Sequence, residues 1–216
     1  MEYFCYHRDR PGSLALREEL VEAHWSYMDG YADRMIARGP VFDEEETLLG
    51  SVHILDLPGP AAARAFAFDE PNYQAGAYRD VLLRRWRNLL GRTMWDFPGG
   101  AADGRRYLVI GLGPGPRPGV GSGPRPRPGV GSGPRPRPGV GSGSGAAEGR
   151  AASGPAVPDV RDDLIAYGPL LSDDGTAWLG TAALVRARDA AAARAVLGDE
   201  PYDGVEVHLW EFGGRR

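Results

Sequence analysis

One histidine and two neighbouring carboxylates are the residues of this chain best suited to acid–base chemistry. His24 lies in the middle of an apolar periodic segment, while Asp69 and Glu70 follow an alanine-rich segment and precede a proline. A carboxylate that accepts a hydrogen bond from an imidazole fixes the tautomer of the ring and stabilises its charged form, which gives a general base near neutral pH. The sequence predicts such a pair between His24 and either acid. The alternatives are that His24 is a hydrogen-bonded core residue and that both acids are solvated at a helix end.

The acidic turn occurs twice, each time at the end of a longer matching segment. AAARAFAFDEPNY at 61–73 matches AAARAVLGDEPY at 191–202, and a glycine precedes the arginine of each segment by 14 residues, at Gly50 and at Gly180. Spacing that is kept over such a length indicates an internal repeat of about a hundred residues. The chain is therefore predicted to be a tandem duplication.

The two predicted copies are unequal. We expect an intact domain at 1–100 and a degenerate domain at 105–216. The position of the second copy that corresponds to His24 is Ser153, so the second copy has no first-helix histidine. The acids at 199–200 are accordingly expected to be solvated.

Hydrophobic periodicity predicts an α+β fold made of two ferredoxin-like units of order β-α-β-β-α-β. The apolar residues from Leu14 to Arg38 recur close to the helical period, and Gly39-Pro40 is expected to end that helix. The first copy is predicted to contain strand 2–7, helix 14–38, strands 41–42 and 49–57, helix 60–68 and strand 78–86. The second is predicted to contain strand 105–112, the last turns of a helix at 160–167, two strands, helix 190–197 and strand 205–212.

An insert rich in Gly, Pro and Arg interrupts the second copy at 113–157, beginning with three ten-residue units. Such a composition neither packs a core nor forms a helix, so it predicts a disordered tether. No aromatic residues alternate with its arginines, which favours a solvated linker over a nucleic-acid partner. Docking of the Arg-Pro units to another protein is the weaker alternative.

Composition restricts the remaining functions. The net charge is −4, and neither an apolar run near 18 residues nor a secretory h-region is present, so we expect no membrane partner and a cytoplasmic location. The single Cys5 is expected to be a core thiol. The four histidines lack metal-ligand spacing, and no helix follows the glycine-rich run after strand 105–112, so no metal and no dinucleotide cofactor are expected.

The segments HWSYMDGYADRMIARGP and AAARAFAFDEPNYQAGAY resemble the YciI-like, or YCII-related, family of small dimeric α/β-barrel proteins. The resemblance implies a His–Asp pair as the active site, with His24 as the base. The family's aspartate before proline is Glu70 here, with Asp69 one residue earlier and Asn72 as an extra residue. The resemblance also implies that Tyr73, Gly39 and Pro40 contact a substrate.

Members of the resembled family pair the sheets of two subunits into a barrel. In a duplicated chain this implies that the two domains pair within one molecule, as a pseudo-dimer, with further homodimerisation as an alternative. The implied activity is that of a lyase or isomerase that abstracts a proton from a small oxygenated, or aromatic, substrate. The alternative is a non-catalytic barrel that binds a small molecule or has a structural role.

Overall fold

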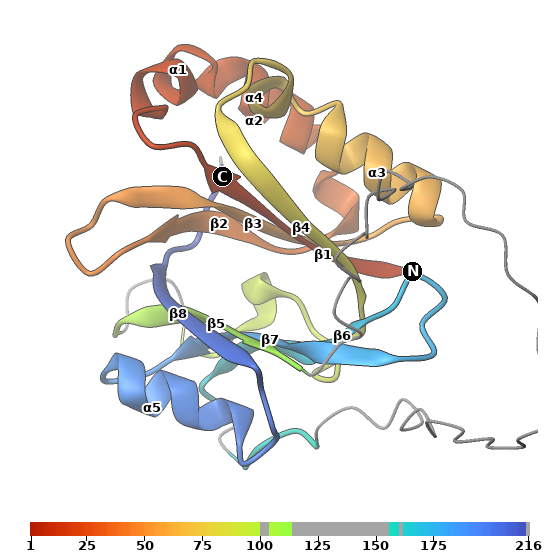
Figure 1. Ribbon diagram of the computed structural model, residues 1–216, viewed down its shortest axis with the longest axis vertical. Coiled ribbons are helices and arrows are strands. Elements are labelled where there is room, and N and C mark those ends of the chain that lie inside the picture. The colour runs from red at the N-terminus through yellow and green to blue at the C-terminus, as the bar shows by residue number, and fades with distance from the viewer. Residues whose placement is uncertain (100–103, 114–155, 160–161, 215–216) are drawn as a thin grey trace, which may run out of the picture.

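The computed structural model describes residues 1–99, 104–113, 156–159 and 162–214. Its strands form a closed barrel in the order β1-β3-β2-β8-β5-β7-β6-β4 (Figure 1), and every strand pairing in these ranges is antiparallel. The strands are β1 (Glu2–Asp9), β2 (Met35–Phe42), β3 (Leu48–Asp56), β4 (Tyr78–Trp86), β5 (Arg106–Leu112), β6 (Leu164–Leu171), β7 (Trp178–Arg186) and β8 (Gly204–Trp210). The predicted α+β class is confirmed.

Helices cover the outside of the barrel on two sides. Figure 1 shows α1 to α4 over one side and α5 over the opposite side. The helices are α1 (Leu14–Glu19), α2 (Val21–Asp29), α3 (Pro60–Phe68), α4 (Pro71–Gln74) and α5 (Ala190–Arg194), with 3₁₀ turns η1 (Ala32–Arg34), η2 (Met94–Asp96) and η3 (Ala195–Leu197). No helix in the described part of the chain is long and apolar enough to cross a membrane. Residues 114–155, and with them nearly all of the predicted tether, lie outside the described ranges.

Strand alternation separates two apolar cores in residues 1–99, which we call the N-terminal half. Successive side chains of a strand point to opposite faces. In β1, Phe4 and Tyr6 therefore join the core inside the barrel, while Tyr3 and Cys5 join the core beneath the helices. Cys5 is fully buried, as expected of a core thiol.

The predicted helix 14–38 is wrong in its last third. Helix α2 ends at Asp29, and Met35–Phe42 is the strand β2, so Gly39-Pro40 lies within a strand and does not end a helix. The apolar residues near position 35 fit either period, and Gly30 disfavours helix continuation. Pairing of β2 with β3 along its whole length then decides the outcome.

The predicted helix turns at 160–167 are also wrong. Residues Leu164–Leu171 form β6, and every side chain in it is buried. The strand is covered on both faces, so its sequence is a continuous apolar run without the alternation that reveals a half-exposed strand.

Residues 104–214, which we call the C-terminal half, repeat the strand pairing of the N-terminal half. Antiparallel partners run from Glu2↔Asp56 to Arg8↔Gly50 in β1 and β3, and from Arg106↔Arg186 to Leu112↔Gly180 in β5 and β7. The ladders β2–β3 and β6–β7 each contain register shifts at two corresponding places. Gly50 and Gly180 have φ of 152° and 151°, where a side chain would be strained.

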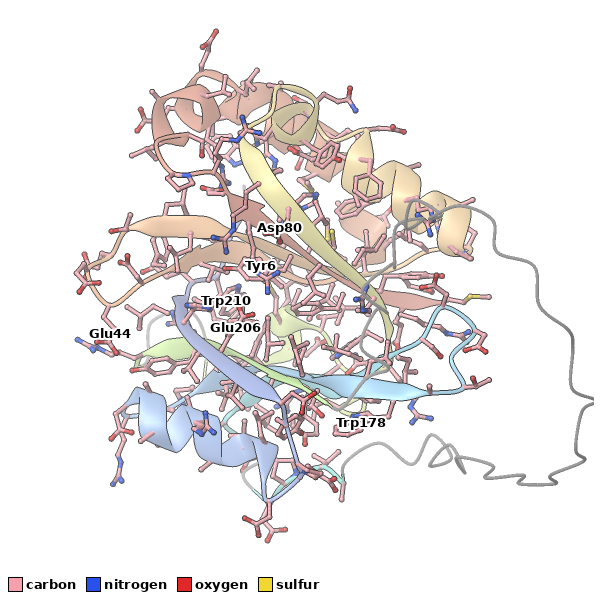
Figure 2. All side chains as sticks on the ribbon, viewed as in Figure 1. Tyr6, Glu44, Asp80, Trp178, Glu206 and Trp210 are labelled. Carbon is pink, nitrogen blue, oxygen red and sulfur yellow. The ribbon has the colours of Figure 1, made fainter. Side chains whose placement is uncertain are left out.

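Two short ladders close the barrel between the halves. Strand β2 pairs with β8 at Val41↔Trp210 and Phe42↔Leu209, and β4 pairs with β6 at Arg85↔Leu171 and Trp86↔Leu170. The indole Nε1 of Trp86 donates to the carbonyl oxygen of Gly168 at 3.0 Å. Tyr6 and Trp210 lie between the two layers of strands, where both belong to the interior core (Figure 2). The barrel interior is thus a single apolar core shared by both halves.

We predict that Gly168→Ala destabilises the fold by at least about 2 kcal/mol. An added Cβ would overlap the carbonyl oxygen of Arg87 and lie 2.8 Å from the Trp86 ring, at the ladder that joins β4 to β6. Urea unfolding monitored by tryptophan fluorescence measures the change. Gly204→Ala is the matched control, because a Cβ there has no described atom within 4 Å. Equal stability of the two variants would contradict the tight packing at this ladder.

Candidate functional site

The structure brings His24 of α2 into contact with Glu70, the residue that precedes α4. The distance between His24 Nδ1 and Glu70 Oε1 is 2.7 Å. The Glu70 side chain is fully buried and that of His24 is 12% exposed. Since Glu70 accepts the Nδ1 hydrogen, the neutral ring keeps its lone pair on Nε2.

Three donors hold the Glu70 carboxylate. Besides His24, the Nδ2 amide of Asn72 donates to Oε1 at 3.2 Å and the backbone N–H of Tyr73 donates to Oε2 at 2.8 Å. Burial acts to raise the pKa of Glu70, but the hydrogen bond and charge of His24 and the Tyr73 amide outweigh it, so the pKa lies below its usual value. Glu70 is therefore a carboxylate that caps α4 and orients the imidazole.

The other residues suggested by the sequence lie around this pair in different ways. Asp69 is exposed at the end of α3 and does not contact His24. The ring of Tyr73 packs edge-on against Phe68 with centroids 5.0 Å apart, so its backbone, and not its phenol, serves the site. Gly39 and Pro40 line the cavity beside His24.

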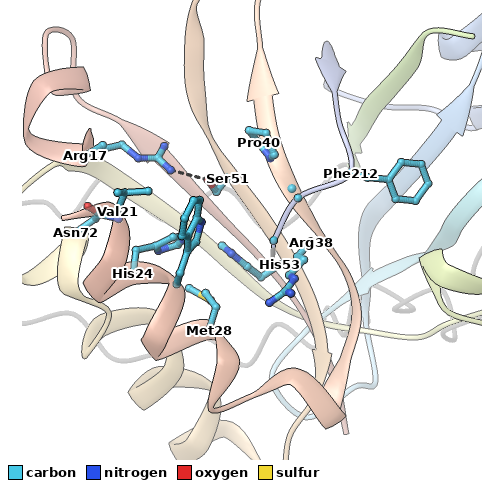
Figure 3. Close-up of a pocket in the computed structure, with 14 residues that line it drawn as sticks. Arg17, Val21, His24, Met28, Arg38, Pro40, Ser51, His53, Asn72 and Phe212 are labelled. Carbon is cyan, nitrogen blue, oxygen red and sulfur yellow. Dashed lines mark hydrogen bonds between the residues drawn. The ribbon is translucent and has the colours of Figure 1, made fainter. Parts of the chain in front are cut away.

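That cavity, of about 230 Å³, opens between the helices and the outer face of β2 and β3. Figure 3 shows His24 and Met28 reaching into it from α2, with His53 and Arg38 on the facing wall. The lining residues are Arg17, Val21, His24, Trp25, Met28, Arg38, Gly39, Pro40, Ser51, His53, Asn72, Phe212, Gly213 and Gly214. The last three belong to the C-terminal half, so both halves build the cavity wall.

Two further histidines are buried close to His24. The ring of His53 contacts those of His24 and His7, with centroids 5.9 and 5.8 Å apart. Nε2 of His7 donates to the carbonyl oxygen of Ala67 at 2.8 Å. Burial lowers the pKa of His7 to about 4, and burial together with the neighbouring histidines holds the pKa of His53 well below its usual range. Both rings are neutral at pH 7.

Arg17 also lines the cavity, and its side-chain contacts hold it in place. Nη1 of Arg17 donates to both carboxylate oxygens of Asp9 at 2.9 and 3.0 Å, and Nη2 donates to the Ser51 hydroxyl at 2.8 Å. Both ionic side chains are nearly buried. This contact ties α1 to β1 and β3 and holds the guanidinium at the cavity wall.

Sequence reasoning missed His53, Arg17, Ser51 and Arg38. His53 and Ser51 were available as alternate positions of a predicted strand, which places both on one face. Arg17 had no comparable signal because its partners are distant in sequence. Arg38 was missed because the segment around it was assigned to a helix.

The C-terminal half has no equivalent of this site among its described residues. In its strand pairing, Gly111 and Thr181 take the places of His7 and Ser51. The Tyr202 ring fills the space beside Gly111, where a Cβ would lie 2.6 Å from it, and its hydroxyl donates to Thr181 Oγ1 at 3.0 Å. Asp199 is exposed and Glu200 is partly buried. The Tyr202 ring thus lies next to the position that corresponds to His7.

No group of three or more His, Cys, Asp or Glu side chains in the described ranges is arranged to hold a metal ion. His7, His24 and His53 lie together through ring faces and edges, with centroid distances near 6 Å. Convergence of nitrogens on one point is what a metal site needs. These three rings therefore form a packed cluster, which we call the histidine group.

A protein-family model matches part of the chain. Residues 1–87, within the N-terminal half, match the model of the YCII-related domain. The family resemblance predicted from the sequence is thereby confirmed.

A solved structure is also similar to part of the chain. It is described as the 5-chloro-2-hydroxyhydroquinone dehydrochlorinase TftG from Burkholderia phenoliruptrix AC1100, in complex with 2,5-dihydroxybenzoquinone. It has 24% sequence identity and a TM-score of 0.39, and the match covers 43% of this chain and 99% of that one. Comparison with curated proteins returns no match.

We predict that the protein loses stability as the pH falls from about 6.5 towards about 4. The unfolded chain protonates His7 near pH 6.5, whereas the folded protein does so only near pH 4, so acid favours the unfolded state across that interval. His7 alone corresponds to about 3 kcal/mol. Denaturant unfolding at several pH values gives the slope.

His7→Gln should flatten this pH dependence, and His208→Gln on β8 is the control that should keep it. The His208 side chain is 25% exposed and pairs with Glu206 at 3.4 Å, away from the histidine group. An unchanged slope in His7→Gln would show that His7 is not held neutral by burial.

Proposed function

We propose that this protein is a lyase or isomerase of the YCII-related family that removes a proton from a small oxygenated substrate. The observation that carries the proposal is the 2.7 Å contact of His24 Nδ1 with buried Glu70 at the wall of a cavity. His24 is the base and Glu70 is the residue that orients it.

The geometry supports a simple proton transfer. Nε2 of His24 takes a proton from a carbon next to a carbonyl, and the C–H electron pair moves onto the carbonyl oxygen to form an enolate. The imidazolium that results is stabilised by the Glu70 carboxylate. Return of the proton to a neighbouring atom completes an isomerisation, while departure of a leaving group from the enolate completes an elimination.

The roles of the remaining candidates follow from their positions. Asp69 is exposed and is assigned no part in the chemistry. Gly39 and Pro40 are proposed as a wall of the substrate cavity. Tyr73 is proposed to act through its backbone N–H, which fixes Glu70.

We predict that the wild-type protein accelerates exchange of the C2 proton of 2-hydroxycyclohexanone for deuterium in D₂O, measured by NMR. This compound is a small cyclic probe with an acidic C–H beside a carbonyl. His24→Gln and Glu70→Gln should each lower the enzymatic rate by about 100-fold or more, because the base is removed or misdirected. Asp69→Asn is the matched control and should exchange at the wild-type rate.

Two outcomes contradict this assignment. If Asp69→Asn exchanged the proton as slowly as Glu70→Gln, the assignment of the orienting role to Glu70 would be wrong. Absence of exchange in the wild type, with the probe shown by NMR to bind, would favour the alternative of a non-catalytic binding module.

We also propose that the C-terminal half is a diverged copy of the N-terminal half, and that the two pair as an internal pseudo-dimer. Support comes from the repeated strand registers and from the matching register shifts. Further support comes from Gly50 and Gly180, which share an unusual φ and the same close approach to a neighbouring strand. The domains are proposed to span 1–100 and 105–216.

In this arrangement one copy keeps the chemistry and the other completes its surroundings. Phe212 to Gly214 extend from β8 of the C-terminal half and line the cavity that holds His24. The backbone N–H of Gly213 donates to the carbonyl oxygen of Arg38 at 3.1 Å. The degenerate copy is therefore proposed to serve as part of the substrate enclosure.

The internal pairing predicts a solution mass equal to one chain, 23.2 kDa. Light scattering coupled to gel filtration measures it across a range of protein concentrations. A mass near twice this value, together with cross-links that join the two halves only between molecules, would replace the internal pseudo-dimer by a swapped dimer.

A further inference from the structure

We infer that the cavity beside His24 binds its ligand through an anionic oxygen, a carboxylate or an ionised phenol or enol, held between Arg38 and His53. The inference rests on the proposed function only in taking this cavity as the substrate site. It adds the charge of the substrate and the groups that recognise it.

The ionisable side chains at the cavity wall are all basic. Of the described residues that line the cavity, the ionisable ones are two arginines and two histidines, and no carboxylate is among them. Arginine presents only hydrogen-bond donors, in a planar fork that matches a carboxylate or another oxyanion. A cavity lined in this way favours an acceptor with negative charge.

The carboxylates that pair with Arg17 and His24 lie outside the cavity lining. Asp9 contacts Arg17 and Glu70 contacts His24, and neither acid lines the cavity. The negative charges of Asp9 and Glu70 reduce the positive electrostatic potential in the cavity. Long-range attraction of an anion is therefore not the main contribution to its binding. Recognition would depend instead on short-range hydrogen bonds from the donors that line the cavity.

Arg38 is the cation best placed for direct contact. Arg17 directs Nη1 at Asp9 and Nη2 at Ser51. Arg38 is nearly buried, and its ion pair with the half-exposed Asp29 has a distance of 4.0 Å. Ion pairs with solvated partners at such distances are weak, and the Arg38 side chain lines the cavity.

His53 supplies an independent sign of a missing partner. Its ring is 98% buried at the cavity wall, and Nδ1 has no hydrogen-bond partner among the described residues. A buried polar atom without a partner costs free energy, and a ligand oxygen that reached it would recover that cost. Because His53 is neutral, one ring nitrogen carries a hydrogen, and the ring can donate it to an oxyanion.

Apolar side chains complete the enclosure and limit the rest of the ligand. Trp25 and Met28 of α2 line the cavity, and so does Pro40 of β2. The Phe212 ring packs against Trp210 and Phe97 of the interior core. The cavity therefore fits a small ligand with one charged oxygen group, and His24 lies beside the remainder of that ligand.

The test uses benzoate and benzamide as isosteric charged and neutral probes, titrated into the full-length protein by calorimetry. Wild type is expected to bind benzoate at least tenfold more tightly than benzamide. Arg38→Gln should weaken benzoate binding by about 10- to 100-fold with little effect on benzamide. Arg38→Lys should retain part of the preference, and Arg64→Gln, an exposed arginine of α3, is the control that should bind as wild type.

A second variant keeps the test decisive if Arg38→Gln fails to fold. Gly214→Ala places a Cβ against the Arg38 guanidinium, at the end of the described chain and outside both cores. It should also weaken benzoate binding. Equal affinity for benzoate and benzamide in wild type, or wild-type benzoate binding in both variants, would overturn the inference.

A third probe distinguishes the two kinds of oxyanion. If the site accepts phenolates, adding protein to 4-nitrophenol at constant pH increases the absorption of the ionised form. If only benzoate binds, the recognised group is a carboxylate, and if neither binds, the inference fails.

His24→Gln separates this inference from the proposed function. Loss of proton exchange with the benzoate preference intact supports both. Absence of exchange in wild type with the preference intact rejects the catalytic role alone. Exchange without any charge preference rejects the anion site alone.

Discussion

The buried carboxylate of Glu70 is the constraint on which the site depends. A charge without solvent is costly unless several donors surround it, and here the donors come from the imidazole of α2, the amide of Asn72 and the backbone of α4. Satisfying Glu70 therefore fixes α4 against α2, with His24 in one tautomer. The remainder of the N-terminal half provides the apolar surroundings, in which neutral His7 and His53 pack close to the pair.

Closure of the barrel gives the C-terminal half a structural role that needs no histidine pair. The interior core contains Tyr6 from β1 and Trp210 from β8, so neither half buries its inner sheet face alone. The extension after β8 also reaches the cavity beside His24. The C-terminal half, whose described residues include no equivalent of the histidine site, supplies a sheet for the barrel and a wall for the cavity.

Much of the fold was predictable because its signals are local. The strands at 2–7, 49–57 and 78–86 and the helix at 60–68 were found from period, glycine and proline. The two wrong helix predictions, at 14–38 and at 160–167, have one cause. Both include part of the segment I-A-x-G-P, which occurs at 36–40 in β2 and at 165–169 in β6. Its short apolar run fits helix and strand alike, and pairing with distant strands decides between them.

The sequence by itself determined the residue types available for acid–base chemistry, the family of the N-terminal half and the absence of a second first-helix histidine, because each is a matter of identity and spacing. Only the tertiary structure decided between Asp69 and Glu70, since the turn into α4 directs one side chain inward and leaves its neighbour in solvent. The same holds for Arg38, His53 and Gly214, which meet at one cavity from β2, β3 and the segment that follows β8. Contacts between residues so far apart in sequence arise from strand pairing and barrel closure, and no local pattern encodes them.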